Sequence, residues 1–166
     1  DAWVANNHQA NRVWTNQGGD QGGTPGTYAD SGQALGNSQS FGVALGDLDG
    51  DGDLDAWVAN YNQANRVWIN QGGDQGGTPG TYVDSAQALG NSRSWDVALG
   101  DLDGDGDLDA WVANDNKQPD RVWINQGGLQ GGTPGTYADS GQALGNADSA
   151  HVALGDLDGD GDLDAW

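Results

Sequence analysis

The chain has 166 residues, enough for one domain of ordinary size, and its 25 acidic and five basic residues give a net charge of −20. A surface this acidic has little with which to neutralise phosphates, so we expect no nucleic-acid partner. No apolar run is long enough to cross a bilayer, so we expect no membrane insertion.

The aliphatic content is low for so much charge. Leu, Ile, Val and Phe number 26 of 166, about 16%, below the roughly 20% under which a highly charged chain is expected to be disordered. Folding must therefore be supported by something else. A bound metal is one candidate, and the area that the eight Trp can bury is the other.

The sequence repeats with a period of about 54 residues. Tryptophans recur at spacings of 54, 54 and 55, at Trp3, Trp57, Trp111 and Trp166. This period divides the chain, with a partial first and last unit, into repeats 1–38, 39–92, 93–147 and 148–166. The units are close to identical even where packing would not dictate the residue, which indicates a young duplication or a designed symmetric scaffold.

Each period predicts four short strands bounded by Gly, Asp and Asn. In the second repeat we expect them at 40–46, 54–60, 66–70 and 80–85. No segment has helical periodicity, and the 30 Gly disfavour helices. Four strands in a period near 50 are typical of a propeller blade. We predict an all-β fold of four-stranded antiparallel blades, as an incomplete ring of about three blades or as a tandem array.

Alternation within the strands indicates two packed faces. Ala56 and Val58 oppose Trp57 and Ala59, and Trp68 opposes its neighbours on either side. We expect the recurring Trp to pack between blades. The alternative is a sugar-stacking face, with the turn 60–63 supplying polar groups, which would make the protein a carbohydrate-binding lectin.

An acidic nonapeptide follows the first strand of every complete repeat. Asp-Leu-Asp-Gly-Asp-Gly-Asp-Leu-Asp occurs unchanged at 47–55, 101–109 and 156–164. Five carboxylates so close together repel one another unless a cation lies among them. The order Asp-x-Asp-x-Asp-Gly is also that of calcium loops. We predict one Ca²⁺ per complete loop, about three per chain; the alternative is a solvated acidic turn without metal.

The predicted ligands follow from the register of a calcium loop, in which positions 1, 3 and 5 bind through side chains and position 7 through its carbonyl. In the first loop these are Asp47, Asp49, Asp51 and Asp53, with Asp55 closing the site because the chain has no Glu. The equivalent residues of the other two loops are Asp101, Asp103, Asp105, Asp107 and Asp109, and Asp156, Asp158, Asp160, Asp162 and Asp164. Asp1 is the last residue of a truncated fourth loop.

Calcium would also change the global electrostatics. Three Ca²⁺ would take the formal charge from −20 to −14, so we expect metal binding and folding to be coupled. Low-affinity calcium sites suit extracellular calcium concentrations, so we expect an extracellular or cell-surface location, as for a secreted bacterial protein. The chain does not begin with Met and has no visible signal peptide, as expected for a mature product or a segment.

The stretch around the first loop resembles a known family. Residues 41–60 begin Phe-Gly-Val-Ala-Leu-Gly, contain the nonapeptide and end Ala-Trp-Val-Ala-Asn. They resemble the FG-GAP repeats of integrin α-subunit propellers and, more closely, the bacterial VCBS-type repeats; residues 65–72 and 80–82 match the bacterial type. The resemblance implies propeller blades whose first loop binds Ca²⁺ through the aspartates named above. The Phe-Gly pair becomes Trp-Asp and Ala-His in the later repeats.

The ends of the sequence predict assembly. Both lie in a second strand, three blades cannot close a propeller of four to eight, and open strand edges invite pairing. We expect further copies of the chain or adjacent repeats as partners. Three arrangements stay open: a six-bladed ring of two copies, a segment of a longer repeat protein, or a head-to-tail filament.

Little in the sequence points to catalysis. His8 and His151 lie at non-equivalent positions of the repeat without a nucleophile motif, and the loop carboxylates are committed to metal. We therefore predict no enzyme and no catalytic residues, but a structural or adhesive module. The Gly-rich loop 71–79 is interpreted as a mobile connector or as a contact between repeats.

Overall fold

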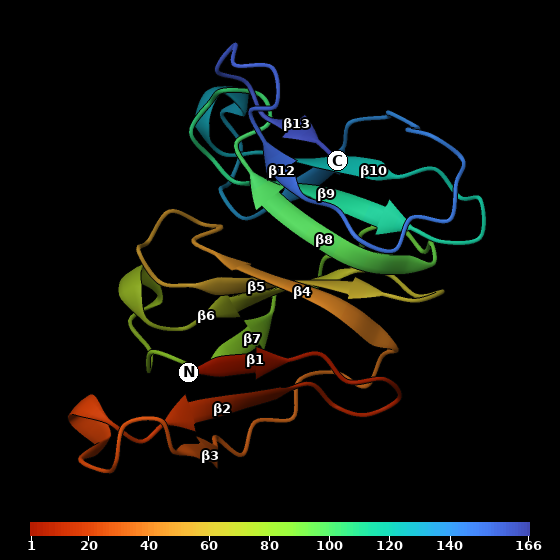
Figure 1. Ribbon diagram of the computed structural model, residues 1–166. Coiled ribbons are helices and arrows are strands. Elements are labelled where there is room, and N and C mark those ends of the chain that lie inside the picture. The colour runs from red at the N-terminus through yellow and green to blue at the C-terminus, as the bar shows by residue number, and fades with distance from the viewer.

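The structure, a computed structural model that describes residues 1–166, consists of antiparallel sheets linked by loops (Figure 1). The only helices are 3₁₀ turns of three residues, η1 (Gly19–Gln21), η2 (Gly73–Gln75) and η3 (Gly128–Gln130), and none could span a membrane. The strands are β1 (Ala2–Val4), β2 (Arg12–Asn16), β3 (Tyr28–Asp30), β4 (Ser40–Gly46), β5 (Asp55–Asn60), β6 (Arg66–Asn70), β7 (Tyr82–Asp84), β8 (Ser94–Gly100), β9 (Asp109–Asn114), β10 (Arg121–Asn125), β11 (Tyr137–Asp139), β12 (Leu154–Gly155) and β13 (Asp164–Ala165).

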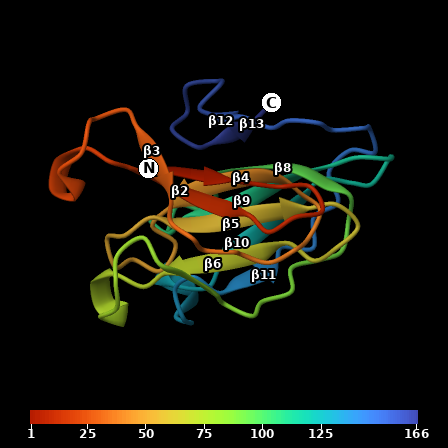
Figure 2. The same ribbon diagram turned by 90° about the horizontal axis from the view of Figure 1, so that it is seen from below.

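The strands form four separate meanders. Their orders are β1-β2-β3, β4-β5-β6-β7, β8-β9-β10-β11 and β12-β13, and we call them the first to the fourth sheet. Figure 1 shows them stacked in chain order from the bottom of the view to the top, and Figure 2 shows the same stack from below. The prediction of an all-β fold of four-stranded antiparallel blades is confirmed, and no sheet closes on itself.

The predicted strand boundaries agree closely with the second sheet. β4 and β6 have the expected bounds, and β5 begins one residue later than expected. The fourth strand is shorter than predicted, because Gly80 has a φ of 79° and the N–H of Thr81 bonds to the carbonyl of Thr78, so a turn occupies its expected start.

The apolar core lies between the sheets. One cluster, between the second and third sheets, contains Trp57, Ala59 and Val67. The other, between the first and second, contains Ala56, Val58 and Trp68. The predicted alternation is thus confirmed, and β5 and β6 pack one face against the first sheet and the other against the third.

Small residues allow the first strands of neighbouring blades to approach closely. A Cβ on Gly42 of β4 would lie 2.8 Å from the Cα of Asp96 and 2.8 Å from the carbonyl oxygen of Trp95, both in β8. Since backbone atoms cannot move aside as a flexible side chain can, only glycine fits at this crossing.

Candidate metal centres

Each acidic nonapeptide connects the first two strands of its sheet, as predicted: β4 to β5, β8 to β9 and β12 to β13. The loop 47–55 winds around Asp47, whose carboxylate accepts hydrogen bonds from the N–H groups of Gly50, Asp51 and Gly52 at 2.9, 3.1 and 3.0 Å. Gly50 and Gly52 have φ values of 81° and 94°, which other residues rarely adopt. The glycines of the motif therefore make the turn that gathers the carboxylates.

Three of the five predicted ligand residues in each loop have converging carboxylates. Asp47, Asp49 and Asp55 each offer an oxygen, and these oxygens lie within 4.8 Å of one another. The same grouping occurs in the other loops, for Asp101, Asp103 and Asp109 and for Asp156, Asp158 and Asp164. Three aspartate groups could therefore hold a metal ion.

The carboxylates of the other two predicted ligand residues of the first loop, Asp51 and Asp53, lie outside this group. The Asp51 carboxylate accepts hydrogen bonds from the N–H of Asp53 at 2.9 Å and the N–H of Asp74 at 3.2 Å. Asp53 was predicted to bind through its carbonyl, and its side chain turns toward Gly72 instead of the convergent group. Asp105 and Asp107 repeat this arrangement in the second loop.

The Gly-rich loop covers the acidic loop, which the sequence did not predict. In η2, the N–H of Asp74 donates to Asp51, and the Nε2 of Gln75 donates to the Oδ2 of Asp49. A Cβ on Gly72 or Gly73 would collide with the carboxylates beneath. The loop 71–79 is therefore held on the acidic loop of its own repeat rather than being only a connector, and its predicted contact with another repeat stays a prediction. The available signal was the near-identity of this exposed loop in every repeat.

The closing aspartate is fixed by the sheet. Asp55 is fully buried, and its two oxygens accept hydrogen bonds from the N–H of Asn70 at 2.7 Å and the N–H of Leu48 at 3.0 Å. Burial raises the pKa of Asp55 to about 6 in spite of these hydrogen bonds, which lower it. Asp109 makes the equivalent bonds, and burial likewise raises its pKa to about 6.

Electrostatics and unpaired oxygens fit a cation. Burial raises the pKa of Asp49, and the nearby charge of Asp51 raises it further. Burial followed by neighbouring carboxylates also raises the pKa of Asp103 and of Asp107. The Oδ1 of Asp49 and the Oδ2 atoms of Asp53 and Asp107 are buried without a hydrogen-bond donor. All-oxygen, anionic donor sets of this kind suit hard divalent cations such as Ca²⁺.

The three loops differ in their surroundings despite their identical sequence. Residues 158–163 are exposed, and the Asp164 carboxylate accepts one backbone hydrogen bond, from Leu157 at 2.9 Å. Asp1 belongs to no convergent group, but its Oδ1 accepts a bond from the N–H of Asn16 at 2.8 Å, just as Asp55 does from Asn70. Asp1 thus has the position of a closing residue without a loop.

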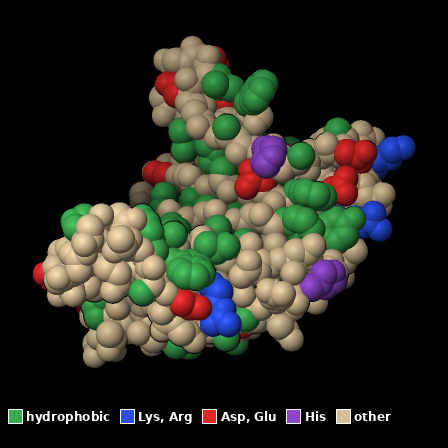
Figure 3. All heavy atoms as spheres, turned by 60° about the horizontal axis from the view of Figure 1, so that its bottom comes forward, with side chains coloured by type: hydrophobic (Ala, Val, Ile, Leu, Met, Phe, Trp, Pro, Cys, Tyr) green, Lys and Arg blue, Asp and Glu red, His purple; other side chains and the backbone are tan.

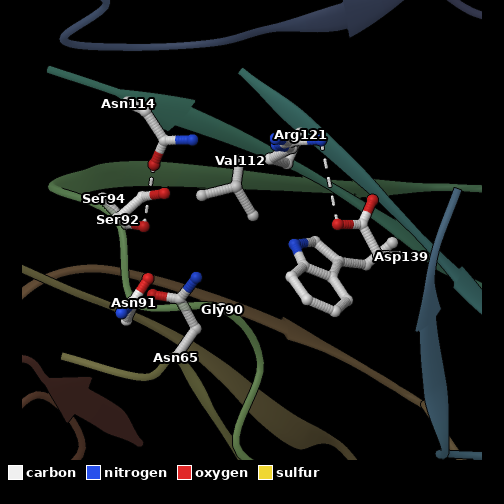
Figure 4. Close-up of a pocket in the computed structure, with 10 residues that line it drawn as sticks. Asn65, Gly90, Asn91, Ser92, Ser94, Val112, Asn114, Arg121 and Asp139 are labelled. Atoms are coloured by element: carbon white, nitrogen blue, oxygen red, sulfur yellow. Dashed lines mark hydrogen bonds and ion pairs between the residues drawn. The ribbon is translucent and has the colours of Figure 1, made fainter. Parts of the chain in front are cut away.

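Two other polar features were considered as sites. His151 lies 3.3 Å from a carboxylate oxygen of Asp96, and His8 contacts the amide of Gln39; both histidines are on the surface (Figure 3). A polar hollow between the second and third sheets is lined by Asn65, Ser94 and eight further residues (Figure 4). An equivalent hollow lies between the first and second sheets. The hollow therefore results from the way repeats pack.

Comparison with known proteins agrees with this arrangement. The FG-GAP-like repeat family matches residues 47–112 and 101–166, and each match begins at an acidic loop. No curated protein matches the sequence. Because the two matches together span residues 47–166, which is well over half of the sequence, the chain belongs to the FG-GAP-like repeat family.

Proposed function

We propose that the protein is a non-enzymatic, extracellular calcium-binding repeat protein with a structural or adhesive role, which assembles with further copies of itself. The convergence of three carboxylates in each of three loops carries this proposal. In the first loop Asp47, Asp49 and Asp55 would hold Ca²⁺, with Asp51 and the carbonyl of Asp53 as further ligands, and the equivalent residues would do so in the other loops.

Bound Ca²⁺ would supply positive charge among carboxylates that otherwise repel one another. The chain's own residues hold the acidic loop in place. Asp47 shapes the turn, Asp55 joins the loop to β6 through Asn70, and Gln75 covers Asp49. Loading the loop would therefore stabilise the junction of β4, β5 and β6, which is a structural role.

The family and the expected calcium affinity support the proposed extracellular location. FG-GAP repeats are typically extracellular, and calcium sites of extracellular modules bind at roughly 10⁻⁴–10⁻³ M, a range that resting cytosol does not reach. The strongly acidic surface, with a net charge of −20, would also favour solubility outside the cell.

Calcium titration calorimetry tests the proposal. We expect three Ca²⁺ per chain, and we expect Asp49→Asn to remove one of them. The matched control is Asp20→Asn, which makes the same change in charge at an exposed position outside the loops. No binding at millimolar Ca²⁺, or three sites retained in Asp49→Asn, would contradict the proposal.

Glycan binding is a second candidate function, favoured by one surface feature. The rings of Phe41 and Trp95 lie 4.5 Å apart, Tyr61 lies 5.5 Å from Phe41 and 6.1 Å from Trp95, and Arg93 lies over Tyr61. Phe41 and Trp95 are partly exposed. Figure 3 shows hydrophobic side chains gathered beside charged groups on one face. Aromatic rings beside polar groups suit sugars.

This cluster replaces the sugar-stacking residues expected from the sequence. Trp57 and Trp68 are buried between sheets, so they are unsuited to stack on a ligand. The predicted polar turn does contribute, since Tyr61 belongs to it and Asn62 accepts a hydrogen bond from the Nε of Arg93 at 3.2 Å. Glycan-array binding that is lost in Trp95→Ala and kept in Trp166→Ala would support this function; no binding to any glycan would contradict it.

A further inference from the structure

The side chain of Asn125 connects the second and third sheets at their acidic loops. Asn125 is the last residue of β10, and its Nδ2 donates to the carbonyl of Leu48 at 2.9 Å, across 77 residues of sequence. The same Nδ2 lies 3.3 Å from the carbonyl of Leu108 in its own repeat. Leu48 lies between Asp47 and Asp49, two of the three converging residues of the first loop. A residue of the third sheet therefore bonds to the backbone of a candidate metal site in the neighbouring repeat.

Both backbone polar groups of Leu48 are engaged. Its N–H donates to the Oδ2 of Asp55, the closing residue of the first loop, at 3.0 Å, and its carbonyl accepts the bond from Asn125. Leu48 is 1% exposed, and Asn125 is equally buried. Since buried backbone groups are nearly always paired, this bond helps to set the position of the loop backbone between Asp47 and Asp49.

A glycine makes a second contact across the same junction. A Cβ on Gly135, two residues before β11, would lie 3.2 Å from the Cβ of Asp49 and 3.6 Å from the carbonyl oxygen of Leu48. A Cβ on the equivalent Gly26 would have nothing within 4 Å, although the φ values of the two glycines, 77° and 83°, are similar. The backbone at Gly135 therefore packs directly on the first acidic loop.

Residues of the second repeat hold Gly135 in this position. The Nε2 of Gln87 donates to the carbonyl of Gly135 at 2.7 Å, and its Oε1 accepts from the N–H of Tyr137 at 2.8 Å. The rings of Tyr137 and Trp57 meet edge to face, with centroids 6.3 Å apart. The junction between the first and second sheets has the same contacts, made by Gln33, Gly80, Tyr82 and Trp3. The contact between Gly135 and the first loop is thus part of a well-packed junction.

Asn125 is itself held by the second acidic loop. Its N–H donates to the Oδ1 of Asp109 at 2.8 Å, and its Oδ1 accepts from the N–H of Gly135 at 3.0 Å. Asp109 is one of the three converging residues of the second loop. Another of them, Asp103, accepts a hydrogen bond from the Nε2 of Gln130 in η3. The second loop thus holds the end of β10 and the turn that follows it, from which Asn125 and Gly135 reach the first loop.

These contacts form a continuous path between two candidate metal sites. The path runs from Asp109 through the backbone and side chain of Asn125 to Leu48. Without a cation, the carboxylates of the second loop repel one another, which favours rearrangements that separate them. Such a rearrangement would displace Asn125, because Asp109 accepts the bond from its N–H. A loaded second loop would instead keep the Nδ2 of Asn125 where it bonds to Leu48.

We propose that Asn125 is a positioning residue for the first loop and couples two calcium sites, so that Ca²⁺ in the loop 101–109 raises the affinity of the loop 47–55. This proposal rests on the proposed function, because it takes both loops to bind Ca²⁺. The net contribution of one neutral hydrogen bond changes an affinity about fivefold. Coupling between binding sites is reciprocal, so Ca²⁺ in the first loop raises the affinity of the second by the same factor.

Electrostatic interaction between the loops alone predicts the opposite sign. Burial raises the pKa of Asp107, and the charge of Asp47 in the neighbouring loop is among the smaller causes that raise it further. The charges of the two loops therefore interact. A cation in one loop would make that loop less negative and so lower the attraction of the other loop for a second cation. The direction of the change in affinity thus distinguishes coupling through Asn125 from an effect of charge.

Titration of the full chain with Ca²⁺, followed by nuclear magnetic resonance, tests the proposal. The amide of Gly52 reports on the first loop and that of Gly106 on the second, since they donate to the first carboxylate of each loop. Asp103→Asn removes a converging ligand from the second loop, and the first loop should then bind Ca²⁺ about fivefold more weakly. Charge alone would strengthen it, because the empty second loop lacks two positive charges and only one negative charge. The control Asp158→Asn makes the same change in the third loop and should leave the first loop unchanged.

Variants at the junction test the path itself. Asn125→Ala should weaken Ca²⁺ binding to the first loop about fivefold. Adding Asp103→Asn to it should weaken the first loop no further, because both changes act through one contact. Gly135→Ala should also weaken the first loop, since its Cβ would meet Asp49, whereas Gly26→Ala, at a similar φ but without that contact, should not.

Circular dichroism establishes that each variant is folded. A first loop that keeps or gains affinity in folded Asp103→Asn and Asn125→Ala would overturn this proposal and leave the proposed function standing. Additive losses from the two changes would also overturn it, since they would act by separate routes. Where Asn125→Ala loses its fold, Gly135→Ala decides, and an unchanged first loop in that variant overturns the proposal. A wild-type chain that binds no Ca²⁺ at any loop would overturn both.

Discussion

The same substitution in three identical loops should have unequal effects. Replacing the closing residue by alanine in Asp55→Ala, Asp109→Ala and Asp164→Ala removes the same ligand from the same nonapeptide. The surroundings differ, because Asp55 and Asp109 are fully buried and each accept two backbone hydrogen bonds. Asp164 is only partly buried and accepts one.

The difference in stability between the variants can be estimated from the backbone N–H groups that lose their carboxylate acceptor. Leaving a buried N–H without an acceptor costs about 1–3 kcal/mol. Asp109→Ala leaves one buried and one partly buried donor, and should lose about 2–4 kcal/mol more of the free energy of unfolding than Asp164→Ala, whose single donor is exposed. Asp55→Ala leaves two buried donors and, at about 2 kcal/mol for each, should lose about 4 kcal/mol more than Asp164→Ala. For a chain of this length that corresponds to a gap in Tm of about 8–16 °C.

Urea and thermal unfolding, followed by circular dichroism in saturating Ca²⁺ at pH 7, measure this gap. In EGTA the gap should shrink, because burial raises the pKa of Asp55 and Asp109 to about 6 and so disfavours their ionised forms when no cation is bound. An equal loss of stability in all three variants with Ca²⁺ would refute the argument from burial.

Four further predictions follow from single features. Gly42→Ala should lower the Tm by several degrees, because its Cβ would meet the backbone of β8. Gly155→Ala should leave the Tm nearly unchanged, because its Cβ would have only the Cδ2 of Leu157 at 4.0 Å, an ordinary van der Waals distance. Gln75→Ala should weaken calcium binding in calorimetry, whereas the equivalent Gln21→Ala, which has no acidic loop beneath it, should not. In EGTA, denaturant titrations should show the free energy of unfolding falling as pH rises from about 4 to about 6, since the folded chain holds protons on its two buried closing aspartates that the unfolded chain releases. Chelation of Ca²⁺ at pH 7 should remove much of the β-sheet signal in circular dichroism, and an unchanged spectrum would mean that Trp packing alone holds the sheets.

The strands were predictable because their signals are local. Alternation of Ala56, Trp57, Val58 and Ala59 assigns side chains to two faces whatever lies opposite, and both faces are buried. The acidic nonapeptide could also be interpreted from the sequence, because the five carboxylates that repel one another lie within nine consecutive residues. Both predictions needed no knowledge of the tertiary arrangement.

The covering of the acidic loop was not predictable in this way. Gln75 and Asp49 are 26 residues apart, and no pattern in the sequence connects them. Glycines such as Gly72 and Gly73 were interpreted as a source of mobility, because a missing side chain signals freedom unless the neighbouring atoms are known. Here the missing side chain leaves room for the carboxylates of Asp51 and Asp53.

The residues that differ between the repeats are as informative as those that agree. The junction residues are the same in each unit: Tyr28, Tyr82 and Tyr137; Gln33, Gln87 and Gln142; Trp14, Trp68 and Trp123. By contrast, equivalent positions diverge at Phe41, Trp95 and Ala150, and at Asn7, Tyr61 and Asp115. Several of these divergent residues meet in the partly exposed aromatic cluster. The contacts that join blades within the chain are therefore the same from unit to unit, while the residues around the aromatic cluster differ.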